Sequence, residues 1–353
     1  MRRVGGYIVL AFLTVMTLVT PVACSWNGPE YDREFANTPQ GNFAALWTIM
    51  DEHYCFFELK ERELGVEWDK VFEHYSQSIS DNMSDRSLFE VLCSMIGELR
   101  DGHVNLSSPY DFGRNWHWKT DYPLNFSKDL QDEYLGTDYK IIGNGYKYTI
   151  FPDNIGYLVV ESFNDKASES RLNSMFNDMV LCNGLIIDIR NNGGGDLTAS
   201  EKLASRFTEK KVLTGYSYYK NGPGHNDFSK PEANWLEPDK YNLRWQKPVV
   251  VITNRSCYSS ANDFACIMKV LPKVTLLGDT TGGGGGLPMS QELPNGWVVR
   301  FSSAPTLDAS KQHIESGIAP HMVVNLTHDD ILRRTDTMIE AARNLINNNL
   351  INP

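Results

Sequence analysis

The sequence contains no dense block of lysine and arginine, although 33 of its 353 residues are of these two types. Aspartate and glutamate number 44, so the formal net charge is −11 at pH 7. Nucleic acid binding depends on a basic patch or stripe, and this charge balance therefore argues against a nucleic acid partner. The acidic surplus favours solubility and says nothing about the fold.

Metal-binding and cofactor motifs are missing as well. None of the eight histidines shows H-E-x-x-H spacing, and the cysteines contain no C-x-x-C pair. We therefore expect neither a metal nor an organic cofactor. Five cysteines follow Cys24, and this odd number argues against a disulfide framework. Cys93, Cys182 and Cys266 lie in apolar runs that are typical of buried thiols.

Long apolar runs are confined to the N-terminus. A basic Met-Arg-Arg start is followed by a mostly apolar stretch to Val22, and then by Ala23 and Cys24. Small residues before a cysteine are typical of a bacterial lipoprotein processing site, which predicts a signal peptide over residues 1–23 and a lipid anchor at Cys24. An ordinary cleaved signal peptide and an uncleaved membrane anchor are the alternatives, because Pro21 is unusual at such a site. No later stretch reaches the about 18 apolar residues of a membrane-spanning helix, so we expect a lipid-anchored protein of the bacterial cell envelope, on the periplasmic or outer-surface side.

The remaining sequence divides into a tether and two folded parts. Residues 24–39 are polar and are predicted to be a tether, and residues 40–105 show the three-to-four-residue apolar spacing of a helical subdomain. Residues 106–353 begin aromatic and turn-rich and then alternate between apolar strands and amphipathic helices, which indicates an α/β layer architecture. Thr327 is the expected N-cap of a long C-terminal helix over residues 329–350. The predicted strands cover residues 139–142, 146–150, 156–160, 184–190, 248–253, 274–277 and 297–301, and the other predicted helices cover residues 168–180, 197–207 and 263–271.

A serine cluster lies between a predicted strand and a predicted helix. Residues 254–264 read Asn-Arg-Ser-Cys-Tyr-Ser-Ser-Ala-Asn-Asp-Phe, with serines at positions 256, 259 and 260. A hydroxyl at a helix N-terminus faces backbone N–H groups that can stabilise developing negative charge. Taken alone, a serine-rich turn is more often only a helix cap.

Three glycines follow the predicted strand at 184–190. Gly193, Gly194 and Gly195 could bring backbone amides close to a ligand and receive an oxyanion there. A structural turn is the alternative, whereas a phosphate loop is excluded because the G-x-x-x-x-G-K-[ST] pattern is absent. Asp188 and Arg190 could form a buried pair that fixes this turn.

A candidate base and a candidate acid lie in two other turns. His103 ends the segment Leu-Arg-Asp-Gly-His, and an imidazole that titrates near neutrality suits a general base for a serine. A single histidine is more often structural. Glu315 begins the segment Glu-Ser-Gly-Ile-Ala-Pro and could orient a base, or it could be a solvated turn carboxylate. The five glycines at 282–286 are either a flexible loop or a mobile wall beside an active site.

Six motifs in this order resemble those of the C-terminal-processing (tail-specific) serine peptidases, in the branch of the tricorn protease core and the interphotoreceptor retinoid-binding protein modules. The motifs occupy residues 99–103, 156–160, 188–195, 253–264, 278–282 and 315–320. The resemblance covers roughly residues 42–326 and implies an α/β fold with a ClpP/crotonase-like core and an N-terminal helical subdomain. Residues 106–353 would then form the peptidase domain together with the C-terminal helix.

The resemblance also implies roles for individual residues. Ser259 falls at the nucleophile position, with Ser256 and Ser260 as near competitors. His103 falls at the position of the base, and Glu315 is similar to the acidic partner. These roles imply a serine endopeptidase that hydrolyses peptide bonds of exported proteins, so a polypeptide is the expected substrate.

The resemblance extends to backbone amides, and the sequence departs from the family pattern at two points. The resemblance implies an oxyanion hole made by the N–H of Ser260 together with Gly193 or Gly194. Relatives with a serine–lysine dyad carry the lysine about 25 residues after the serine, where this chain has glycines near Gly284, and His103 is therefore favoured as the base. Only about 50 residues separate His103 from the Gly-Tyr-Leu strand motif at residues 156–160, too few for the PDZ domain that many relatives insert there.

A second class of function stays open at this point. A non-catalytic protein that binds a peptide or a hydrophobic ligand could use the same scaffold, as the retinoid-binding relatives do, although the presence of serine, histidine and glutamate favours activity. A crotonase-like acyl-CoA enzyme would share only the fold and fits poorly with an exported lipoprotein. The sequence gives no indication of the oligomeric state.

Overall fold

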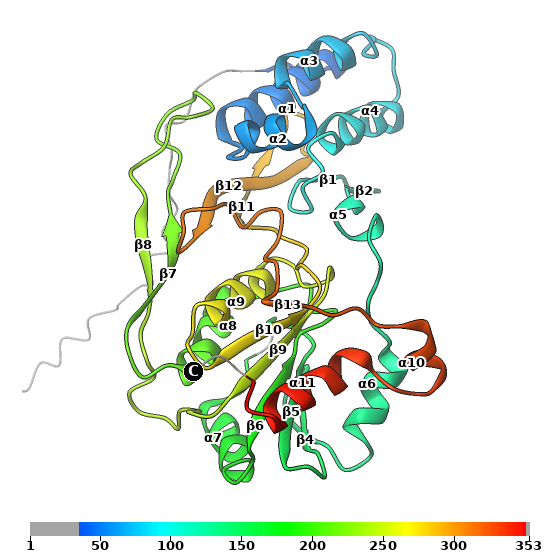
Figure 1. Cartoon of the computed structure of the whole chain (residues 1–353). Coiled ribbons are helices and arrows are strands. Elements are labelled where there is room, and N and C mark those ends of the chain that lie inside the picture. Colours follow the sequence, from blue (N-terminus) through cyan, green and yellow to red (C-terminus); the bar gives the residue numbers. More distant parts are fainter. Residues whose placement is uncertain (1–34, 165, 351–353) are drawn as a thin grey trace, which may run out of the picture. The chain divides into compact units, whose positions relative to one another are not determined.

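The computed structural model describes residues 35–164 and 166–350, which belong to one compact unit (Figure 1). The predicted signal peptide, the predicted lipidation site Cys24 and most of the predicted tether lie outside these residues. Within the two described ranges, no helix combines the length and the apolar character needed to cross a bilayer.

The larger of two sheets has seven strands. In spatial order they are β13 (Met322–Val323), β10 (Val274–Gly278), β9 (Val249–Thr253), β6 (Gly184–Asp188), β5 (Ile155–Val160), β4 (Tyr146–Ile150) and β3 (Lys140–Gly143). The pairs from β13 to β5 are parallel, and β4 pairs antiparallel with both β5 and β3. Every residue of β5, β6, β9 and β10 is buried, as expected for parallel strands with both faces covered.

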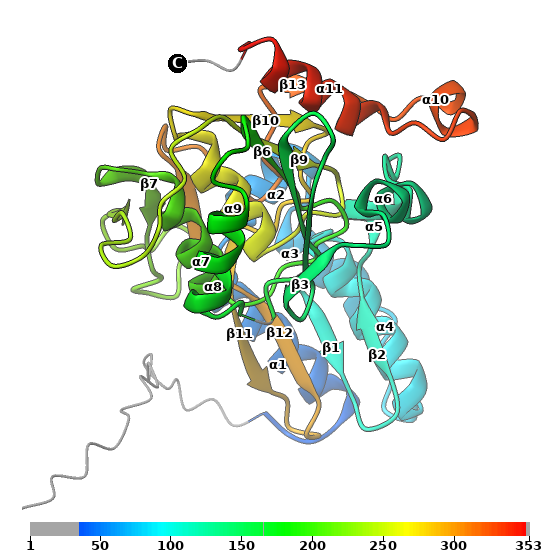
Figure 2. The same cartoon turned by 90° about the horizontal axis from the view of Figure 1, so that it is seen from below.

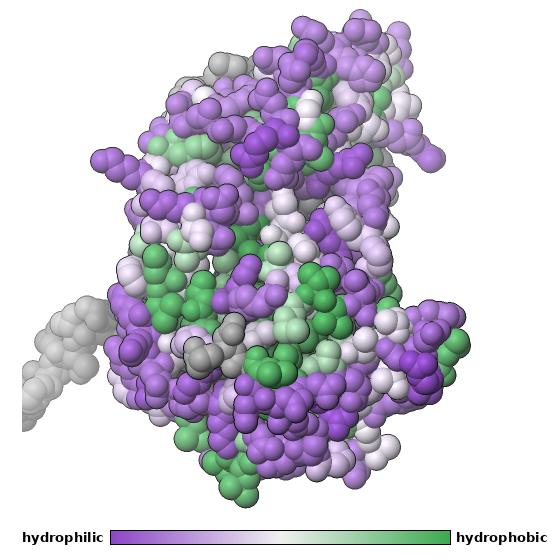
Figure 3. Space-filling view, viewed as in Figure 1, coloured by the Kyte–Doolittle hydropathy of each residue, from purple (hydrophilic) through white to green (hydrophobic). Residues whose placement is uncertain are grey.

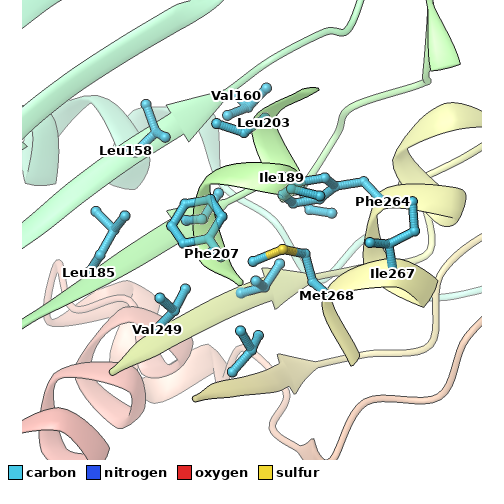
Figure 4. Packing of buried hydrophobic residues seen from close by; sticks show 14 of the residues in the cluster. Leu158, Val160, Leu185, Ile189, Leu203, Phe207, Val249, Phe264, Ile267 and Met268 are labelled. Atoms are coloured by element: carbon cyan, nitrogen blue, oxygen red, sulfur yellow. The ribbon is translucent and has the colours of Figure 1, made fainter. Parts of the chain in front are cut away.

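Helices cover both faces of this sheet (Figures 1 and 2). One face carries α7 (Glu169–Asp178), α8 (Leu197–Ala204) with the short η1 (Ser205–Phe207), and α9 (Ser260–Lys269), and the other carries α6 (Lys128–Leu135) and α11 (Thr337–Asn347). Successive side chains of a strand point to opposite faces. Leu158 of β5 therefore packs in the cluster that contains Phe264 of α9 (Figure 4), whereas its neighbour Tyr157 packs with Met338 of α11.

The second sheet supports the N-terminal helices. It consists of β2 (Phe112–Arg114), β1 (Asn105–Ser107), β12 (Val298–Asp308), β7 (Val212–Ser217) and β8 (Glu232–Leu236) in spatial order, with β11 (Gly286–Glu292) also paired to β12. The helices are α1 (Pro39–His53), α2 (Phe57–Leu64), α3 (Trp68–Ser76) and α4 (Asp85–Gly97), and α5 (His117–Thr120) follows β2. Buried apolar side chains of α1, α2, α3 and α4 form one cluster with Val299 and Phe301 of β12, so the predicted helical region shares a core with a late strand.

The C-terminal helix differs from its prediction. The single helix expected over residues 329–350 is two helices, α10 (His328–Leu332) and α11, separated at Arg334, whose φ of 57° does not continue a helix. Thr327 caps α10 as predicted. A second cap, Asp336, accepts hydrogen bonds from the first turn of α11 and starts that helix.

The face of the molecule drawn in Figure 3 is largely hydrophilic, and its hydrophobic side chains form small separate groups. Apolar side chains scattered in this way are usual on folded domains and need no functional explanation. Buried polar residues at the ends of the strands are more informative about function.

Candidate active site

The serine turn connects β9 to α9 and ends at Ser259. This residue has φ 57° and ψ −125°, a conformation that non-glycine residues rarely adopt and that the surroundings must hold in place. Its N–H donates to the carbonyl of Gly283 at 2.9 Å, and its carbonyl accepts from the N–H of Asp263 at 3.0 Å. The Tyr258 N–H donates to the Asn192 carbonyl at 3.1 Å and joins the serine turn to the glycine turn. The Ser259 hydroxyl is thereby fixed at the N-terminus of α9.

His103 reaches this hydroxyl from the second sheet. It lies shortly before β1, is 3% exposed, and has its Nε2 3.1 Å from Ser259 Oγ. Burial lowers the pKa of His103 to about 4; the charge of Asp101 opposes this shift, and those of Arg300 and Arg114 add to it. The imidazole is therefore neutral near pH 7 and able to accept the proton of Ser259.

The two competing serines lie elsewhere in the turn. Ser256 and Ser260 are both buried, and the described part of the chain shows no hydrogen bond from either hydroxyl to His103. The Ser260 hydroxyl has no hydrogen-bond partner within that part. Of the three candidate serines, the structure brings Ser259 to the candidate base.

The glycine turn lies close beside the serine turn. A Cβ placed on Gly194, whose φ is +105°, would lie 2.8 Å from the Ser259 Cβ, so this approach requires glycine. The Gly194 N–H already donates to the side-chain oxygen of Asn192 at 2.9 Å. The N–H groups of Gly193 and Ser260 have no acceptor among the described residues. Gly193 and Ser260 therefore fit the predicted oxyanion hole, whereas Gly194 does not offer a free N–H.

Glu315 is buried near the site but is bonded to other groups. Its Oε1 accepts from Lys60 Nζ at 3.1 Å, and its Oε2 accepts from the Gly285 N–H at 2.9 Å. Burial and the nearby Asp101 raise the pKa of Glu315 to about 7, against the opposing charge of Lys60. No hydrogen bond joins Glu315 to His103 in the described residues, where the ring Nδ1 is buried without a partner. Glu315 thus does not orient the base by direct contact, because Lys60 and Gly285 occupy its oxygens.

Asp101 is a site residue that the sequence reasoning missed. It is 1% exposed, and its Oδ1 accepts a hydrogen bond from the backbone N–H of His103 at 2.7 Å. Its Oδ2 accepts from the hydroxyls of Ser302 at 2.9 Å and Tyr54 at 3.1 Å. Asp101 stands two residues before His103 in the same motif, and this proximity is the only signal the sequence offers for it.

Lys60 is a second site residue that the sequence did not indicate, and the residues around it give even less signal than those around Asp101. It lies on α2, 255 residues before its partner Glu315, in a segment rich in charged residues. Such a lysine is normally exposed, whereas Lys60 is 5% exposed. Only the packing of α2 against the loop between β12 and β13 turns it into a member of a buried ion pair.

A buried ion pair holds the strand that leads into the glycine turn. The predicted pair of Asp188 and Arg190 is confirmed, with Arg190 Nη2 2.7 Å from Asp188 Oδ2. The same guanidinium contacts Asp336 at 2.9 Å, and all three side chains are fully buried. Because Asp336 also caps α11, this cluster ties the end of β6 to the C-terminal helix.

A pocket of about 450 Å³ lies beside Ser259. Its lining includes the apolar side chains of Leu197, Leu287, Pro288, Ala304 and Ile314 and the charged side chains of Asp196, Asp263 and Arg300. Gly284, Gly285 and Gly286 form part of its wall. A Cβ on Gly284 would lie 2.6 Å from the Tyr258 ring, so the glycine run allows close packing here. Its predicted mobility stays a prediction.

Most of the described chain is similar to known peptidases. Residues 154–324 match the model of Peptidase family S41, and residues 35–97 match that of the tricorn protease C1 domain. The crystal structure of a provisionally assigned peptidase from Parabacteroides merdae is 50% identical, covers 88% of this chain and 97% of its own, and superposes with a TM-score of 0.84. The photosystem II D1 C-terminal processing protease shares the fold at 14% identity, with a TM-score of 0.52 over 82% of this chain and 94% of its own.

A curated relative matches over a shorter region. The carboxy-terminal processing protease CtpA of Bacillus subtilis is 26% identical over 176 residues, which are 49% of this chain and 36% of CtpA. The chain thus spans about a third of the length of that relative. The chain belongs to peptidase family S41. It is therefore classed with the serine-type peptidases, which are hydrolases, and the predicted α/β fold with an N-terminal helical region is confirmed.

Proposed function

We propose that the protein is a serine-type endopeptidase in which Ser259 is the nucleophile and His103 is the general base. The observation that carries this proposal is the 3.1 Å separation of Ser259 Oγ and His103 Nε2. The neutral state of the buried imidazole supports it, because only the neutral form can take a proton. The adjoining pocket is large enough for side chains of a polypeptide.

The reaction follows from this arrangement. Ser259 Oγ bonds to the carbon of the scissile carbonyl while its proton passes to His103 Nε2. The carbonyl oxygen becomes an oxyanion, which the N–H groups of Gly193 and Ser260 would bind. When the C–N bond breaks, His103 returns the proton to the leaving amine and an acyl-enzyme remains on Ser259. The oxygen of a water molecule then bonds to the acyl carbon while one of its protons passes to His103 Nε2. The bond between the acyl carbon and Ser259 Oγ breaks, His103 returns that proton to Ser259 Oγ, and the second product leaves as a carboxylic acid.

Labelling by a fluorophosphonate, followed by mass spectrometry of the labelled peptide, tests the nucleophile. Wild-type protein should react at Ser259, and Ser259→Ala should lose both labelling and peptide hydrolysis while keeping its thermal unfolding transition. His103→Gln should lower the labelling rate by about 10²–10⁴-fold, the usual contribution of a general base.

Ser256→Ala is the matched control, because it removes another hydroxyl from the same turn and should leave labelling of Ser259 in place. Labelling of Ser256 or Ser260 in the wild type would move the nucleophile. A folded wild-type protein that binds peptides and never reacts would instead favour the alternative, a binding protein on a peptidase scaffold.

We also propose that the substrates are exported polypeptides and that a lipid at Cys24 holds the enzyme to a membrane of the cell envelope. The sequence pattern around Cys24 supports this location. Membrane fractionation of the full chain should recover it with the bilayer, and Cys24→Ser should release it. Equal membrane recovery of both forms would mean that the uncleaved apolar segment before Cys24 can hold the chain at the membrane, and the intact mass of the wild type would then decide whether Cys24 carries a lipid.

A further inference from the structure

A positive charge develops on His103 when it takes the proton of Ser259, and a buried site must stabilise that charge. The expected acid, Glu315, is engaged by Lys60 and Gly285 instead. The carboxylate that is bonded to His103 is Asp101, whose Oδ1 accepts the backbone N–H of His103 at 2.7 Å.

Four donors from separate parts of the fold hold the Asp101 carboxylate. Besides the His103 N–H, its Oδ1 accepts from the hydroxyl of Tyr258 in the serine turn at 3.3 Å. Its Oδ2 accepts from Ser302 on β12 and from Tyr54 at the end of α1. A carboxylate with this many donors is stabilised in its ionised form and cannot rotate without breaking several bonds.

Asp101 and Glu315 differ in charge state. Burial alone would raise the pKa of Asp101, but the charges of Lys60 and His103 and the hydrogen bonds from His103 and Ser302 hold it below its ordinary value. The pKa of Glu315 is about 7, because burial and the charge of Asp101 outweigh Lys60. Two buried carboxylates near one lysine separate in this way. Asp101 is the member that stays ionised beside the base.

The remaining charged groups around His103 increase the need for an anion. Arg114, whose Nε donates to the Gly102 carbonyl at 2.8 Å, and Arg300 on β12 both disfavour a protonated imidazole. The other titratable groups in contact with this cluster are Tyr54, Tyr258 and Cys55, whose pKa values burial raises well above their ordinary range, so they are neutral.

We propose that Asp101 is a positioning residue of this site, which fixes the backbone of His103 and supplies the negative charge that stabilises the protonated imidazole. This inference rests on the proposed peptidase function. The competing interpretation is a purely structural Asp101 that joins β12 to the N-terminal helices through Ser302 and Tyr54. That interpretation predicts a loss of stability without a change in the pH dependence of activity.

The test compares three variants that remove one charge each. Asp101→Asn keeps the shape of the side chain, and its Nδ2 can face the hydroxyls of Ser302 and Tyr54, which can accept as well as donate. Glu315→Gln makes the same change at the other buried carboxylate. Asp138→Asn is the matched control at an exposed carboxylate. For each protein, kcat/KM for a peptide substrate and the rate of phosphonate labelling at Ser259 are measured from about pH 2.5 to pH 9, because the acid limb of the wild type is expected near the His103 pKa of about 4.

Asp101→Asn should lower kcat/KM on its plateau by about tenfold, the equivalent of one pKa unit of lost stabilisation of the imidazolium. Its acid limb should move to lower pH, because a base that has lost its anion is harder to protonate. Glu315→Gln should reduce the plateau less, and Asp138→Asn should match the wild type.

A folded Asp101→Asn protein with the wild-type plateau and acid limb would overturn the inference, and so would a larger loss in Glu315→Gln. If Asp101→Asn does not fold, Ser302→Ala replaces it. Removal of this donor makes Asp101 easier to protonate, so activity should begin to fall at a higher pH than in the wild type, and an unmoved limb would count against the inference. Failure of the wild type to label at Ser259 would instead refute the proposed function.

Discussion

A buried, neutral histidine is the residue on which both stability and chemistry depend. His103 is 3% exposed and its pKa is about 4, because burial disfavours the charged ring more than Asp101 favours it. In the unfolded chain the ring has its ordinary pKa of about 6.5. Between these two values the unfolded chain binds a proton that the folded protein does not. Folding is therefore increasingly opposed as the pH falls through this range.

The free energy of unfolding should show this coupling. The contribution of His103 is fully present above its unfolded pKa and is lost as the pH falls towards 4, by up to about 3 kcal/mol for a shift of this size. Urea unfolding of wild type and His103→Gln at pH 7, 5.5 and 4 isolates the effect, because carboxylates that titrate in the same range cancel in the difference. The wild type should lose stability relative to the variant on acidification. A difference that is constant with pH would show that the ring is not kept neutral by the fold.

At the scale of secondary-structure elements, the sequence predicts those strands whose residues are all buried alike. The parallel strands β5, β6, β9 and β10 are buried along their whole length, and their continuous apolar runs are correspondingly clear. The strand β7 is half-buried at both ends, and β8 and β11 mix exposed, half-buried and buried positions, so these three strands lack both a continuous apolar run and a clean alternation. The break before α11 also leaves no clear signal, because Arg333, Arg334 and Thr335 are not strong helix breakers.

The residues of the candidate site also fall into those that the sequence predicts and those that it does not. Ser259 and His103 stand in turns next to elements that the sequence predicts, and a resemblance between ordered motifs was enough to select them. Lys60 and Asp101 were not selected, because their importance comes from burial and from partners that are distant in sequence. The environment of Glu315 could not be predicted for the same reason: its cation comes from α2.

At the scale of the whole molecule, one ion pair connects the N-terminal helices to the loops of the site. Lys60 on α2 reaches Glu315, which also accepts the N–H of Gly285 in the glycine run. Both charged side chains are nearly inaccessible to solvent, at 6% and 3% exposure. Removing one partner of such a pair leaves an uncompensated buried charge, which costs far more than the loss of a surface pair.

Lys60→Met should therefore lower the free energy of unfolding by about 3–5 kcal/mol at pH 8. The loss should be smaller at pH 5, because Glu315 without its lysine has a pKa raised further above its ordinary value. The folded protein then keeps a proton that the unfolded chain releases as the pH rises, so stability falls with increasing pH. Lys70→Met removes an exposed lysine that is paired with Glu67 and should leave the free energy of unfolding nearly unchanged, because water and salt screen such a surface pair. Urea unfolding at both pH values measures all three proteins, and adding Glu315→Gln to Lys60→Met should recover part of the loss at pH 8. If Lys60→Met lowers the free energy of unfolding as little as Lys70→Met does, or lowers it equally at both pH values, Lys60 does not stabilise a buried negative charge on Glu315.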